Sequence, residues 1–186
     1  MGLFQKTENQ EAQPVSQRHK LEGRYASARH NILLVLLFTA VNIILLVANS
    51  NTYFLFSAFV PYAIVDLAMF LCGKYPAEIY GDLSEYEFFG TSVLVIAVVL
   101  AAVICGLYLL CWLLSKKGRV AWLIVALSLF VLDTLLMLLN GIGADSIIDV
   151  IFHGWVILSL SLGTVAHLKL KKLPAEDTAT PELPQE

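Results

Sequence analysis

The chain has 186 residues, of which 58% are hydrophobic and only 15% are charged, and its formal net charge is −3. Soluble domains are roughly 45–50% apolar and about 25% charged, so this composition excludes an ordinary soluble fold. The basic residues form no single large patch in the sequence, which argues against a nucleic-acid-binding protein. We therefore predict an all-α integral membrane protein, built as a small helical bundle.

Composition divides the chain into four regions. Residues 1–17 are polar and rich in Gln and Glu, so we expect a disordered tail. Residues 18–30 are basic, and we expect a juxtamembrane helix that lies at the membrane surface. Residues 31–168 hold the apolar segments and are predicted to form the transmembrane domain. Residues 169–186 begin with lysines and end in an acidic, proline-rich stretch that we also expect to be disordered.

Five apolar segments follow one another in the transmembrane domain. At about 1.5 Å of rise per residue, each is long enough to cross a hydrocarbon core of about 30 Å. Each is also longer than the apolar run of an ordinary core helix. The segments are 31–48, 52–73, 91–115, 120–140 and 147–168.

The second segment differs from the others because it carries Pro61 and Asp66 near its middle. A proline inside a helix costs about 3 kcal/mol, and an aspartate at the bilayer centre costs roughly 2.5–3.5 kcal/mol. We therefore predict four crossing helices plus one re-entrant or proline-broken segment that returns to the side it entered. In this prediction "TYFLFSAF" forms a half-helix or a surface helix. A second piece then follows, with Pro61 in its first turn, where proline is well tolerated.

The distribution of Lys and Arg supports this topology. Cytoplasmic flanks accumulate these residues, and four crossings with the N-terminus inside place eleven of the twelve on the cytoplasmic side. Only Lys74 then lies outside. Five crossing helices, with the N-terminus outside, are the alternative. We expect a bacterial plasma membrane with both termini cytoplasmic. The basic residues expected at the membrane surface are Arg18, Lys20, Arg24, Arg29, Lys116, Lys117, Arg119, Lys169, Lys171 and Lys172.

Ionisable residues within apolar segments are candidate functional residues. Asp149 and His153 are four positions apart, which places both on one face of a helix. In the four-crossing topology, all such residues fall in the outer half of the bundle. We hypothesise one outward-opening polar pocket formed by Asp66, Asp133, Asp145, Asp149 and His153. The alternative is that these groups only cap helices and hydrogen-bond to their neighbours.

The sequence contains no recognised nucleophile, zinc or phosphate-binding motif, and we expect neither a cofactor nor a metal ion. The lipid bilayer is the expected partner, together with a partner helix or a second copy that packs against small residues. The small-residue pairs are Ala97/Ala101, Ala102/Gly106 and Ser159/Gly163.

Three functions compete. The first is a non-enzymatic accessory or interaction protein, and the second is a transporter or channel component that uses the polar pocket. The third is an intramembrane metal-dependent hydrolase.

Overall fold

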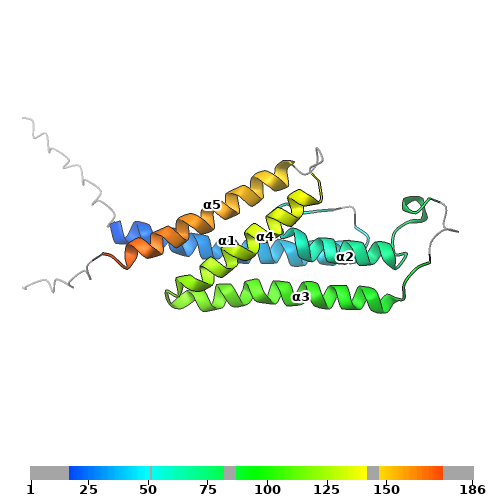
Figure 1. The fold of residues 1–186 in the computed structure, drawn as a ribbon, viewed down its shortest axis with the longest axis horizontal. Coiled ribbons are helices and arrows are strands. Elements are labelled where there is room, and N and C mark those ends of the chain that lie inside the picture. Colours follow the sequence, from blue (N-terminus) through cyan, green and yellow to red (C-terminus); the bar gives the residue numbers. More distant parts are fainter. Residues whose placement is uncertain (1–16, 51, 82–86, 142–146, 174–186) are drawn as a thin grey trace, which may run out of the picture.

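A computed structural model describes residues 17–50, 52–81, 87–141 and 147–173, in which helices are the only regular secondary structure (Figure 1). Its helices are α1 (Gln17–Val47), α2 (Phe59–Leu71), α3 (Thr91–Leu114), α4 (Val120–Leu139) and α5 (Ile147–Leu170). Two short 3₁₀ turns, η1 (Ala77–Ile79) and η3 (Ser115–Lys117), follow α2 and α3.

The four long helices confirm the predicted membrane bundle. α1, α3, α4 and α5 are each long and apolar enough to cross a membrane. At about 1.5 Å per residue, α3, α4 and α5 measure about 30–36 Å, which matches the hydrocarbon thickness. α1 is longer, because the basic residues 18–30 and the first apolar segment form one continuous helix.

The second apolar segment re-enters, as predicted, but its first half is not helical. Residues 52–58 have no helical structure, so the prediction of a half-helix or surface helix there is wrong. In Figure 1 this connection runs back along the bundle from the end of α1, and α2 then returns towards the same end. Asn49, just after α1, donates a hydrogen bond of 3.1 Å to the carbonyl oxygen of Lys74, just after α2. The two ends of the segment are therefore neighbours.

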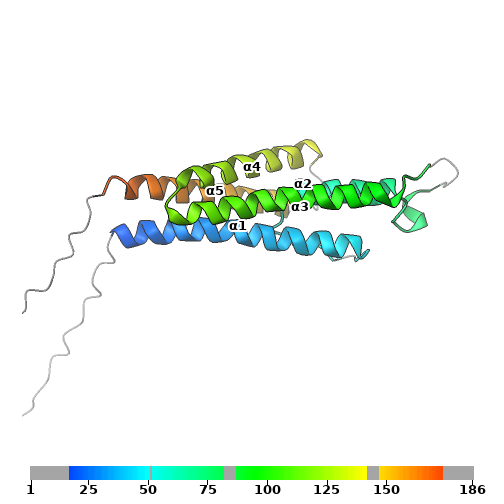
Figure 2. The ribbon, with the colours of Figure 1, turned by 90° about the horizontal axis from the view of Figure 1, so that it is seen from below.

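Three basic segments of the chain meet at one end of the bundle, here called the basic end. The start of α1, the α3–α4 turn and the finish of α5 all lie there, as Figures 1 and 2 show. Tyr25 of α1 donates a hydrogen bond of 2.7 Å to the carbonyl oxygen of Ser115. Its ring also lies 4.7 Å from that of His167. These contacts join three helices next to the charged residues.

Small residues allow α1 and α5 to pack closely. A Cβ atom at Gly163 would lie only 2.2 Å from the Cβ of Ala28. One turn away, Asn31 donates a hydrogen bond to Ser159. The predicted Ser159/Gly163 pair thus faces a neighbouring helix of the same chain. Gly106 is different, because a Cβ there meets no atom within 4 Å.

This difference predicts opposite effects of the same substitution. Gly163→Ala forces α1 and α5 apart and should lower the free energy of unfolding by about 1–3 kcal/mol, the usual cost of overpacking. Gly106→Ala is the matched control and should be neutral or stabilising by up to about 1 kcal/mol, because alanine favours a helix more than glycine does. Denaturant titration in mixed micelles measures both. Equal stabilities of the two variants would contradict the close α1–α5 packing.

Candidate functional site

The start of α2 lies among the other helices, far from either end of the bundle, and its backbone donors need partners there. The first four N–H groups of a helix have no acceptor within the helix. The amide of Ala58 donates to Oγ1 of Thr39 at 2.8 Å. The amides of Phe59 and Val60 donate to the two carboxylate oxygens of Asp133, at 2.9 and 2.8 Å. Pro61 has no N–H. All four positions are therefore accounted for.

The side chain of Asp133 thus caps the N-terminus of α2, although Val60 lies 73 positions before Asp133 in the sequence. We call this arrangement the Asp133 cap. A negative charge at a helix N-terminus is favoured by the helix dipole as well as by its hydrogen bonds. Asp133 is 4% exposed, so these bonds form almost without water. The sequence predicted a functional or structural role for Asp133, and the structure assigns it this contact.

Two α1 residues hold the non-helical chain that leads into α2. The amide group of Asn42 pairs with the backbone of Phe54, accepting from its N–H at 2.8 Å and donating to its carbonyl oxygen at 2.6 Å. It also donates to Ser57 Oγ at 3.0 Å. Thr39 and Asn42 are each 1% exposed. Neither residue was among the candidates predicted from the sequence, although two polar residues three positions apart in an apolar helix mark one polar face.

His153 completes the Asp133 cap. Its ring stacks on Phe130, with centroids 4.9 Å apart. Nδ1 donates to the carbonyl oxygen of Asp149 at 2.8 Å, since that oxygen can only accept. Nε2 lies 3.3 Å from Oδ2 of Asp133. Asp133 and His153 are therefore in direct contact, and their side chains are 4% and 2% exposed.

A small cavity of about 170 Å³ lies next to the Asp133 cap. Asp149 lies at this cavity and is half-buried, and the side chains of Tyr53 and Asn140 line it as well. The structure thus brings together Asp133, Asp149 and His153 of the predicted pocket. Asp145 lies outside the described residues.

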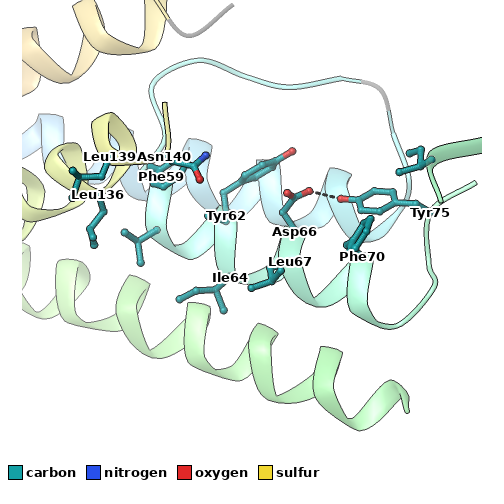
Figure 3. A pocket seen from close by; sticks show the side chains of 13 residues that line it. Phe59, Tyr62, Ile64, Asp66, Leu67, Phe70, Tyr75, Leu136, Leu139 and Asn140 are labelled. Atoms are coloured by element: carbon teal, nitrogen blue, oxygen red, sulfur yellow. Dashed lines mark hydrogen bonds between the residues drawn. The ribbon is translucent and has the colours of Figure 1, made fainter. Parts of the chain in front are cut away.

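Asp66 occupies a different cavity. It lies in a groove of about 1080 Å³ between α2 and the last turn of α4 (Figure 3). Tyr75 donates a hydrogen bond to Oδ1 of Asp66. Burial, followed by the bond to Asp66 and the charge of that carboxylate, raises the pKa of Tyr75 above its ordinary value. Tyr75 consequently keeps its proton and remains a donor to Asp66.

The predicted surface residues of the basic end lie apart from both cavities. Arg29 donates to Oγ of Ser115 at 2.9 Å, and its guanidinium carbon lies 5.8 Å from the ring centroid of Trp112. The Lys116 ammonium lies 4.2 Å from the same ring centroid. These cation–π contacts place Trp112 among cations at the end of α3, as expected for an interfacial tryptophan.

Within the described ranges, no group of three or more His, Cys, Asp or Glu side chains is arranged to hold a metal ion. Comparisons with models of known protein families, with curated proteins and with solved structures find no match to this chain.

The Asp133 cap makes a graded prediction. Asp133→Leu leaves two buried amides without acceptors, at about 1–3 kcal/mol each, and should lower the free energy of unfolding by about 2–6 kcal/mol. Asp133→Asn keeps one acceptor oxygen and should cost less. Leu132→Ala, at an exposed neighbouring position, is the control and should cost least. Denaturant titration ranks the three variants. A loss in Asp133→Leu no larger than in Leu132→Ala would refute the cap.

Proposed function

We propose that this chain is a non-enzymatic interaction protein of the membrane, and that the groove between α2 and α4 is its binding surface. The groove itself carries this proposal. Its volume of about 1080 Å³ slightly exceeds the roughly 300–1,000 Å³ of typical ligand sites. Its walls are mainly apolar, with a few polar groups, as in most binding sites for small molecules. Lining residues include Ile64, Asp66, Leu67, Phe70, Leu136 and Leu139.

The length of α2 limits which occupants fit the groove. Thirteen residues form a helix of about 20 Å, too short to cross the bilayer. A partner helix of full transmembrane length would extend well beyond a groove of this length. A lipid-sized occupant fits better, because a single hydrocarbon chain is thin and can lie along α2.

The positions of the carboxylates favour binding over transport. A transporter hypothesis needs Asp66, Asp133 and His153 around one water-filled space. Asp133 instead accepts two backbone hydrogen bonds and contacts His153. Asp66 bonds to Tyr75 in the other cavity. Because Asp133 and Asp66 have separate partners, we favour an interaction protein in which Asp133 is structural and Asp66 faces the ligand.

We also infer that the basic end faces the cytoplasm. In the described residues, the predicted membrane-surface cations lie on the segments that meet at that end, whereas Lys74 follows α2 at the opposite end. Lys and Arg near spanning helices are retained on the cytoplasmic side. We further propose a bacterial plasma membrane as the setting.

Site-specific photocrosslinking in native membranes tests the binding surface. A photoreactive residue at Leu67, which is 58% exposed in the groove, should yield one adduct of discrete mass. The matched control is Leu37 of α1, which is 61% exposed outside the groove and should yield only mixed lipid adducts. Adding Ala63→Trp, which fills the groove, should abolish the discrete adduct. The same mixture of adducts at Leu67 and Leu37 would refute the proposal.

A further inference from the structure

We propose that the groove binds a single-chain amphiphile with an ammonium head group, held at Asp66. This inference rests on the proposed function, because it names the chemical class of the ligand for the same groove. Three observations support it: the Asp66 carboxylate without a cationic partner among the described residues, the aromatic rings beside it, and the apolar walls between Asp66 and the start of α2.

Among the residues that the structure describes, no Lys, Arg or His side chain is ion-paired with Asp66. Its hydrogen-bond donor there is the hydroxyl group of Tyr75. An aspartate within the membrane costs roughly 2.5–3.5 kcal/mol, and such residues normally pair with an opposite charge. A bound cation would offset this cost, whereas an anionic head group would add a second negative charge.

Aromatic rings flank the carboxylate. Figure 3 shows Asp66 between the rings of Tyr62 and Tyr75, with Phe70 one turn further along α2. Aromatic faces attract organic cations, and ammonium groups are commonly recognised by rings of this kind. A divalent metal ion would need several oxygen ligands, but the groove contributes a single carboxylate. The surroundings of Asp66 therefore suit an organic ammonium group better than a metal ion.

Apolar side chains wall the groove between Asp66 and the start of α2, where Asn140 lies beside Phe59. Tyr75 lies near the end of the bundle where α2 finishes, and Asp66 lies five residues before that finish. Further in, Ile64 and Leu136 form the walls. An amphiphile would thus place its head group beside Asp66 and its chain along the inner half of α2. Its head and chain would have the same order as those of the lipids around it.

Native mass spectrometry of the purified full chain in non-ionic detergent tests the inference. The probes are tetradecylamine and tetradecanol, which share a chain length and differ in charge. We expect the amine to bind at least tenfold more tightly than the alcohol, because only the amine pairs with Asp66. This comparison needs no variant, so it holds even if a substitution impairs folding.

Three variants test whether Asp66 causes the preference for the amine. Asp66→Asn should weaken amine binding about tenfold while leaving alcohol binding within twofold, which also shows that the variant is folded. Glu78→Gln removes an exposed carboxylate near the same end of the bundle and should change neither affinity. Ala63→Trp fills the groove and should weaken both.

The results that would overturn the ammonium inference differ from those that would overturn the proposed function. Equal binding of amine and alcohol, unchanged by Asp66→Asn but weakened by Ala63→Trp, would overturn the ammonium inference and leave the binding groove intact. Amine binding that falls equally in Glu78→Gln and Asp66→Asn would also overturn it, because general surface charge would then explain the preference. If neither probe binds, or Ala63→Trp changes nothing, both the inference and the proposed function fail.

Discussion

The fold depends on the hydrogen bonds that the amides of Phe59 and Val60 donate to the Asp133 carboxylate. No water is available in a bilayer core, so non-helical backbone is tolerated there only where protein or a water-filled cavity covers it. Thr39 and Asn42 serve the same purpose for the non-helical chain before α2. With these partners, a segment of the chain enters the bundle, turns and leaves on the same side. Without them, its buried amides would be left unpaired.

The Asp133 cap and the groove are parts of one arrangement. The cap fixes where α2 begins, and the finish of α2 lies near the end of the bundle to which it returns. α2 continues beyond the last turn of α4, as Figure 1 shows, and the groove lies along α2 beside that turn. One short, anchored helix thus links the buried polar contacts to the proposed binding surface.

The re-entrant segment could be predicted from the sequence, because Pro61, Asp66 and the positions of the lysines and arginines act through general membrane energetics. The contacts could not, since they depend on how each helix is rotated about its axis. Asp66 was expected to meet Asp133. Instead, the backbone at the start of α2 meets Asp133, and Asp66 lies seven residues later, about 10 Å along the helix. This displacement separates the predicted single pocket into two cavities.

The sidedness of three positions tests the re-entrant segment most directly. Single cysteines replace Gln17, Glu78 and Arg119 in a chain from which Cys72, Cys105 and Cys111 have been removed, and a membrane-impermeant maleimide is applied to intact cells and to inverted vesicles. Four crossings place Gln17 and Arg119 on one side and Glu78 on the other. Labelling of Gln17 and Glu78 from the same side, with Arg119 on the opposite side, would mean five crossings and would contradict the account.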